Sequence, residues 1–229
     1  MEQKLNSGST VLNKLLEYGY ERDILTTVYG PAGSGKTTLC LLASIAAVKE
    51  GKKVIYIDTE GGFSAIRLQQ LDADEKVLHN ILVLKPTNFE EQISALVKLK
   101  EMINDKIGLI VVDTIGMLYR IELGKGNRFN VDSKQVNNEL SLQILYLTEI
   151  ARKNNIPILL TNQVYADFDE KDAVKMVGGD ILQYGSKCLF ELKRFKNYRK
   201  AVLKKHRHVK EGKEVVFEIV QQGFVEIVG

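Results

Sequence analysis

A glycine-rich stretch near the N-terminus has the residue types and spacing that bind phosphate groups. It reads Gly30, Pro31, Ala32, Gly33, Ser34, Gly35, Lys36, Thr37 and fits the pattern G-x-x-x-x-G-K-[ST] in full. Backbone N–H groups of such a loop turn toward phosphate, and the dipole of the next helix adds positive potential. Lys36 would reach the β- and γ-phosphates, and the Thr37 hydroxyl would bind Mg²⁺. We count the adjacent Thr38 among the nucleotide-binding residues.

The flanks of this loop favour a nucleotide site over a chance glycine turn. Residues 24–29 have the pattern of a short buried strand, and residues 39–48 form an apolar, Ala-rich run of helical length. A strand, a glycine turn and a helix are the context that the motif requires. The sequence therefore predicts that the chain binds a nucleoside triphosphate.

Three polar side chains follow other predicted strands, and the carboxyl ends of parallel strands are where ligands bind. Asp113 ends the apolar run 109–113 and is the expected second anchor for Mg²⁺, through water. Glu60 follows the strand 53–58 and has the reach of a general base for an attacking water. Its alternative role is a loop acid bonded to a helix N-terminus. Gln163, at the end of strand 158–163, could contact the γ-phosphate and report its loss to the next loop.

Strands and helices alternate along most of the chain, which predicts βαβ units and a mostly parallel sheet. The expected helices cover residues 9–18, 39–48, 63–71, 88–103 and 132–154, and the expected strands cover 24–29, 53–58, 81–84, 109–113 and 158–163. From residue 187 the strands 188–192, 201–203 and 215–219 follow one another without helices. We expect an α/β fold, a twisted sheet flanked by helices with a C-terminal antiparallel β extension, as one domain over residues 1–229.

Composition limits the class of protein. Hydrophobic residues make up 45% of the chain, which is ordinary for a globular protein, and there is neither a signal peptide nor an apolar run that could span a membrane. The two cysteines, Cys40 and Cys188, fall in predicted core elements. We expect a reducing, cytoplasmic location and no contact with a membrane. Cysteine and histidine spacing gives no sign of Zn²⁺.

The net charge of +3 conceals an uneven distribution. Residues 187–213 contain eleven Lys or Arg and two acids, and the remainder of the chain is acidic. Such a segment is suited to a polyanion, although a solvated, lysine-rich hairpin is the alternative. If the polyanion is DNA, the candidate contacts are Lys196, Arg199, Lys200 and Lys204.

Several motifs occur in an order and spacing that resemble the RecA/Rad51 recombinase family. They are residues 30–37, 56–61, 109–113 with 117–120, and 161–164. The resemblance covers nearly the whole chain and is strongest to the archaeal RadB group, short paralogues of the archaeal recombinase RadA, because of the block 199–208. It implies a RecA-like ATPase core. It also implies that Lys36, Thr37 and Asp113 bind ATP and Mg²⁺, that Glu60 is the catalytic base, Gln163 the γ-phosphate sensor, and that Arg67 lies near the adenine.

The resemblance implies an accessory role in homologous recombination and DNA repair. Members of that group bind ATP and single-stranded or branched DNA, hydrolyse ATP weakly, and are linked to RadA and to a Holliday-junction nuclease. A homodimer is compatible with this role. The alternative is an ATP-dependent regulator similar to the circadian-clock (KaiC-like) branch of the superfamily, without a DNA role.

The sequence departs from full recombinases of the family in its DNA-binding parts. The ATPase core begins almost at residue 1, so we expect no N-terminal helical DNA-binding domain, and no Phe-x-x-Ala segment precedes the core. The first DNA loop would cover residues 121–131, with Lys125 and Arg128. The second would cover residues 164–180 and is rich in acids, which repel a phosphate backbone. Strand exchange is therefore not expected.

Lys205 and Arg207 are separated by one residue on a predicted strand, so both side chains would point to one face. They resemble a pair of lysines in bacterial RecA that reach the γ-phosphate held by the neighbouring subunit. This resemblance implies that both residues act in trans, as an arginine finger does. Binding of DNA is the alternative.

Overall fold

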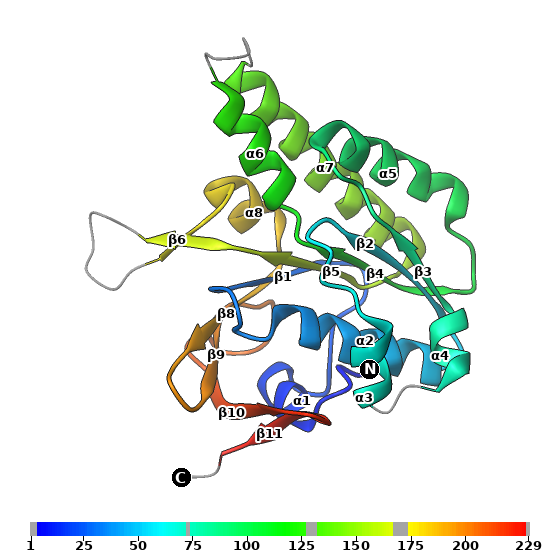
Figure 1. Ribbon diagram of the computed structural model, residues 1–229, viewed down its shortest axis with the longest axis vertical. Coiled ribbons are helices and arrows are strands. Elements are labelled where there is room, and N and C mark those ends of the chain that lie inside the picture. Colours follow the sequence, from blue (N-terminus) through cyan, green and yellow to red (C-terminus); the bar gives the residue numbers. More distant parts are fainter. Residues whose placement is uncertain (1–3, 72–73, 127–131, 167–173, 228–229) are drawn as a thin grey trace.

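A sheet of nine strands forms the centre of the computed structural model, which describes residues 4–71, 74–126, 132–166 and 174–227 (Figure 1). The strand order is β11-β10-β9-β8-β1-β5-β4-β2-β3, and β6 and β7 form a separate ribbon. The strands are β1 (Leu25–Tyr29), β2 (Lys53–Asp58), β3 (Ile81–Leu84), β4 (Ile107–Asp113), β5 (Ile158–Asn162), β6 (Val164–Ala166), β7 (Val174–Met176), β8 (Cys188–Arg194), β9 (Arg199–Lys205), β10 (Glu214–Val220) and β11 (Gly223–Glu226).

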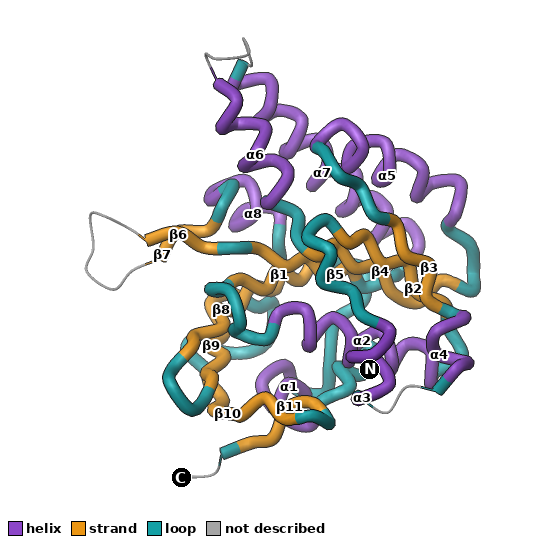
Figure 2. Tube along the Cα trace, viewed as in Figure 1, coloured by secondary structure: helices purple, strands orange, loops and turns teal. Residues whose placement is uncertain are grey.

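Helices cover both faces of the sheet (Figure 2). They are α1 (Thr10–Leu16), α2 (Lys36–Lys49), α3 (Ala65–Gln70), α4 (Glu75–His79), α5 (Phe89–Met102), α6 (Met117–Lys125), α7 (Ser133–Asn154) and α8 (Gly179–Gly185). Side chains of α1 to α4 pack on one face and those of α5 to α8 on the other, which gives two hydrophobic clusters. None of the helices among the described residues is long and apolar enough to cross a membrane.

The central strands pair in parallel, as the alternation of strands and helices predicts. β1 pairs with β5 and β8, and β4 pairs with β2 and β5, all in parallel. Every residue of β1 and β4 is buried. A parallel strand with helices on both sides is mostly apolar, which explains the aliphatic run of β4. The carboxyl ends of these strands lie at one edge of the sheet, and the phosphate-binding motif follows β1 there.

The C-terminal strands differ from the prediction in two respects. β9 and β10 are antiparallel to their neighbours, as expected, and a further antiparallel strand that was not predicted, β11, follows them. β8, however, pairs in parallel with β1, so it continues the central sheet and the antiparallel extension begins at β9. β8 and β9 form a hairpin whose tip, residues 195–198, lies at the same edge as the phosphate-binding loop. This places the basic segment beside the predicted nucleotide site.

Local signals set most helix ends, but three short helices were not expected. Asn88 caps α5 through its side chain, which accepts from the Glu91 N–H at 2.9 Å, and Asp132 caps α7. The helices α4, α6 and α8 and the β6–β7 ribbon lie where we expected loops. In particular, α6 covers residues 121–125, the first part of the expected first DNA loop. Both cysteines are free and buried, as predicted.

Candidate functional site

The glycine loop is held between β1, α2 and the C-terminal strands. Gly35 precedes α2 with a φ of 106°, a left-handed conformation that favours glycine. A Cβ at Gly35 would lie 3.0 Å from the Ile219 methyl group and 3.3 Å from the Phe224 ring. A Cβ at Gly30 would lie 2.3 Å from the Leu192 carbonyl oxygen. Close packing of the C-terminal strands therefore requires glycine at both positions.

Lys36 is directed onto the loop itself. Its ammonium group donates to the carbonyl oxygens of Gly30 at 2.8 Å and Pro31 at 3.1 Å. Burial lowers the pKa of Lys36, while the negative charges of Glu60 and Asp113 oppose that shift. The hydroxyl of Ser34 is buried without a hydrogen-bond partner among the described residues. A buried cation and an unpaired donor at a helix N-terminus fit the phosphates of a nucleotide.

The Asp113 carboxylate collects three hydroxyl groups at the end of β4. Its Oδ2 accepts from Thr37 and from Tyr56, each at 2.8 Å, and its Oδ1 accepts from Thr161. Asp113 is only 3% exposed. An Asp carboxylate beside the Thr37 hydroxyl is an all-oxygen set, which suits Mg²⁺. The residues present therefore fit the cation that the motif predicts.

Glu60 and Gln163 lie in contact on the same edge. Glu60 Oε1 accepts from the Gln163 amide at 2.7 Å and from the Thr114 hydroxyl at 2.9 Å. Both residues line a cavity of about 470 Å³ together with Arg120. The predicted base, Glu60, and the predicted sensor, Gln163, are thus hydrogen-bonded to each other.

Asp58 fixes the loop that carries Glu60. Its carboxylate is buried and accepts from the backbone N–H groups of Gly62 at 3.0 Å and Phe63 at 3.1 Å. A Cβ at Gly62 would lie 3.4 Å from the Thr37 hydroxyl, so this loop passes close to the metal-binding residues. Asp58, Tyr56 and Thr161 lie within the sequence motifs but were not predicted to be site residues. The signal that could have identified them is their position close to predicted site residues at strand ends.

Two arginines of the β8–β9 hairpin are bonded to the glycine loop. Arg194 donates to the Ala32 carbonyl at 3.2 Å, and Arg199 Nε donates to the Gly33 carbonyl at 3.0 Å. With the two bonds from Lys36, the carbonyls of residues 30 to 33 each accept a hydrogen bond from a cation. Arg199, expected to contact DNA, is thus turned toward the nucleotide site.

Arg67 joins α3 to the turn between β10 and β11. Its guanidinium donates to the carbonyl oxygens of Val220 at 3.0 Å and Gln221 at 2.9 Å. The same hairpin supplies Ile219, which packs at Gly35. Arg67 therefore borders the region beyond the glycine loop, and its proximity to the adenine stays a prediction.

Most cations of the basic segment have partners within the chain. Lys200 pairs with Glu214 at 2.9 Å and Lys204 with Glu191 at 3.2 Å. Glu214 lies one position beyond residues 187–213, so the count of charges in that segment did not include this acid. Lys187, Lys196 and Lys210 are the cations of this segment whose side chains make no hydrogen bond or ion pair with a described residue. Ion pairs with glutamates therefore neutralise part of the positive charge that was counted in residues 187–213.

Lys205 and Arg207 do not share a face of one strand. β9 ends at Lys205, and Arg207 lies beyond it. Lys205 donates to the Gln183 carbonyl of α8 at 2.8 Å, whereas Arg207 pairs with Glu21 at 2.8 Å and Asp23 at 2.7 Å. The predicted common orientation is wrong, because the alternation of a strand does not continue past its end.

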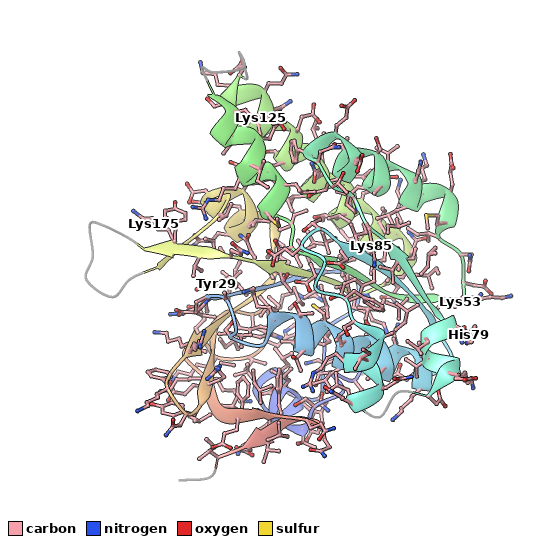
Figure 3. The ribbon with its side chains drawn as sticks, viewed as in Figure 1. Tyr29, Lys53, His79, Lys85, Lys125 and Lys175 are labelled. Carbon is pink, nitrogen blue, oxygen red and sulfur yellow. The ribbon has the colours of Figure 1, made fainter. Side chains whose placement is uncertain are left out.

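The expected DNA loops are described only in part. Lys125 is the last residue of α6 and pairs with Glu122 at 2.6 Å; Figure 3 shows it at the outer end of that helix. Arg128 lies outside the described residues. In the second expected loop, β6 and β7 pair antiparallel and residues 167–173 are not described. Asp180 belongs to the first turn of α8.

Comparison with known proteins decides the family. The Rad51 family model matches residues 3–227. The chain belongs to the Rad51 family. A "DNA repair and recombination protein RadB" of Methanobrevibacter smithii is 40% identical over 229 residues, which covers 96% of this chain and 94% of that protein. A protein of the same name from Methanococcus maripaludis is 43% identical over 216 residues, covering 93% and 96%.

A solved structure agrees with these matches. The chain in the "Crystal structure of the RadB recombinase" has a TM-score of 0.82 and 36% identity, and the match covers 98% of this chain and all of that one. The resemblance to the RadB group is thereby confirmed, and the fold is RecA-like. In this Rad51-family chain, the motif residues Lys36, Thr37, Asp113, Glu60 and Gln163 meet at one edge of the sheet.

Proposed function

We propose that this chain is a DNA repair and recombination accessory protein that binds ATP with Mg²⁺ and hydrolyses it weakly. The observation that carries the proposal is the meeting of the glycine loop, Asp113, Glu60 and Gln163 at one sheet edge. The printed name of its relatives supports a role in repair and recombination. Membership of the Rad51 family favours this role over the clock-type regulator.

The chain's own residues would divide the work of the reaction. Lys36 would leave the Gly30 and Pro31 carbonyls for the β- and γ-phosphates, because phosphate oxygens carry more negative charge than carbonyls. Thr37 and Asp113 would hold Mg²⁺, which when bound neutralises charge on the phosphate oxygens. Glu60 would accept a proton from the attacking water, with Thr114 orienting its carboxylate.

The contact between Gln163 and Glu60 supports weak hydrolysis by an isolated chain. In this arrangement Glu60 Oε1 already accepts two hydrogen bonds. Gln163 has to leave Glu60 before its amide can reach a γ-phosphate. We infer that DNA or a neighbouring subunit favours this exchange, whereas a lone chain stays in the bonded form.

DNA and protein partners complete the proposal. We propose single-stranded or branched DNA as the nucleic acid, a RadA-type main recombinase as a protein partner, and a Holliday-junction nuclease as a second one. A homodimer would provide the same kind of neighbour. Lys205 and Arg207 would then act either on a neighbour's nucleotide or on DNA.

Steady-state ATP hydrolysis tests the proposal. We expect slow Mg²⁺-dependent turnover by the wild-type chain, faster turnover when single-stranded DNA and the recombinase are added, and none by Lys36→Ala under any of these conditions. Equal turnover by the wild type and Lys36→Ala would show that the glycine loop is not the site of hydrolysis.

A further inference from the structure

The tip of the β8–β9 hairpin carries an aromatic pair that the nucleotide site does not use. The rings of Phe195 and Tyr198 are stacked, with centroids 4.5 Å apart and planes inclined by 15°. A backbone bond from the Phe195 N–H to the Tyr198 carbonyl closes the turn at 3.0 Å. Phe195 is 38% exposed although its side chain is wholly apolar. A two-ring stack that is partly open to solvent at Phe195 therefore lies at the end of a hairpin.

Lys196 lies within the same turn and is available for a ligand. It is exposed and makes no hydrogen bond or ion pair within the part of the chain that the structure describes. Lys200 and Lys204, further along β9, are paired with glutamates. An aromatic face beside an unpaired cation is the combination that binds single-stranded nucleic acid, because the ring stacks on a base and the cation contacts a phosphate.

Arg199 holds this tip in a fixed position. Its Nη1 donates to the carbonyl oxygens of Phe195 at 3.0 Å and Tyr198 at 2.9 Å, while its Nε donates to Gly33 at 3.0 Å. The Arg199 guanidinium is therefore hydrogen-bonded both to the turn that carries the two rings and to the glycine loop. A surface that is ordered before binding loses less conformational entropy when its ligand arrives.

We propose that Phe195 and Tyr198 form a stacking site for a base of single-stranded nucleic acid, with Lys196 on the adjoining phosphate. The inference rests on the proposed function, of which it identifies one DNA-contacting surface. The base lies on the open face of Phe195, and Tyr198 supports that ring from behind. Because Arg199 also bonds Gly33, the bound strand lies next to the nucleotide site.

The test compares two fluorescent oligonucleotides of equal length, one of thymidines and one of abasic sites with the same phosphates. We expect the wild type to bind the thymidine strand more tightly. Phe195→Leu should lower that affinity by about 5-fold or more, in the range that stacking provides, and leave abasic binding unchanged. Phe195→Tyr should retain the preference for bases. Lys196→Gln should weaken binding of both strands to a similar extent.

Tyr18→Leu is the matched control, because Tyr18 is 85% exposed and lies after α1. It should change neither affinity. If the wild type binds thymidines and Phe195→Leu binds them equally well, the stacking site is wrong and the proposed function stands. If Phe195→Leu loses only binding of the recombinase, the tip is a protein contact and the inference is wrong. A wild type that binds neither strand overturns the DNA role and this inference together.

Discussion

At the scale of single residues, the candidate nucleotide site joins residues of the sequence motifs to partners from other strands. Lys36, Thr37 and Asp113 belong to motifs whose spacing is short or whose position follows from a strand end. The partners that complete the site, Tyr56, Thr161 and Arg194 among them, lie in other strands. Pairing of the sheet brings them together, and no local pattern encodes such a contact.

Lys36→Ala should abolish ATP binding without unfolding the chain. Among the described residues, the Lys36 ammonium donates to the backbone carbonyls of Gly30 and Pro31, so its loss removes a phosphate ligand and leaves the hydrophobic clusters intact. Calorimetric titration with ATP and Mg²⁺ measures the first effect, and circular dichroism checks the fold. Unchanged ATP affinity in a folded Lys36→Ala variant would contradict the assignment of the loop.

Glu60→Gln should retain ATP and slow its hydrolysis. The amide keeps the shape of the carboxylate but cannot accept the proton of water, and a general base is worth about 10²–10⁴-fold. Single-turnover hydrolysis with the recombinase and DNA present is the appropriate measurement, because a decrease in rate can be measured only when the wild-type rate is well above background. Thr114→Val is a useful companion variant because it removes one bond to Glu60 and keeps the carboxylate. A full rate in Glu60→Gln would exclude Glu60 as the base.

At the scale of elements, most strands and helices were predictable, but α4, α6, α8, the β6–β7 ribbon and β11 were not. The seven-residue strand β4 and the capped 14-residue helix α5 carry strong local signals. The helices α6 and α8 carry weak ones, because glycines in and around both favoured loops. The orientation of the β8–β9 hairpin toward the glycine loop depends on the parallel pairing of β8 with β1, which the sequence did not reveal.

Arg199→Ala should weaken ATP binding, although Arg199 is not placed to touch the nucleotide. The Gly33 carbonyl and the hairpin turn would lose a shared donor, which leaves the loop less ordered. We expect a loss of about 2- to 10-fold, a modest effect for a partly exposed, charge-assisted bond. Lys196→Ala, in the same turn, serves as the control and should bind ATP normally. Identical ATP affinities of Arg199→Ala and the wild type would show that the hairpin and the loop are independent.

We expect Lys196 and Lys200 to contribute unequally to DNA binding, because Lys200 is paired with a glutamate and the Lys196 side chain has no partner among the described residues. Lys196→Ala should flatten the log–log salt dependence of single-strand binding by roughly 0.7, the value for one phosphate contact. Lys200→Ala should change it less, because Lys200 is paired with Glu214. Anisotropy titrations over a range of salt concentrations give both slopes. A larger change in Lys200→Ala than in Lys196→Ala would contradict this order.

At the scale of the whole molecule, the count of charges over residues 187–213 overstates the number of cations that are free to bind DNA. The cations of residues 187–213 find acids from distant segments, such as Glu17 for Lys213 and Glu21 for Arg207. Tertiary structure determines these pairs, so a count over a window could not include them. What remains of the predicted basic surface is a small number of lysines whose side chains have no partner among the described residues. The structure adds an aromatic pair at the hairpin tip, which the count of charges did not predict.

A test of the trans role of Lys205 and Arg207 has to separate that role from the ion pairs that Arg207 makes with Glu21 and Asp23. Arg207→Ala should lower the melting temperature, because the Glu21 carboxylate is buried and would lose its strongest partner. Glu21→Gln is the control that disturbs the same pair and keeps the cation. If the trans role holds, Lys205→Ala and Arg207→Ala reduce recombinase-stimulated hydrolysis while the ATP affinity of the isolated chain is unchanged. Loss of DNA affinity alone would exclude the trans role.

Binding of a fluorescent single-stranded oligonucleotide across salt concentrations, with ATP and Mg²⁺ present, tests the central claim most directly. A recombination accessory protein that contacts phosphates releases counterions, so the logarithm of its affinity should fall linearly with the logarithm of salt concentration. The slope should be about −0.7 for each phosphate contacted. A chain that binds ATP but shows no binding of the oligonucleotide even at low salt would contradict the account and favour an ATP-dependent regulator without a DNA role.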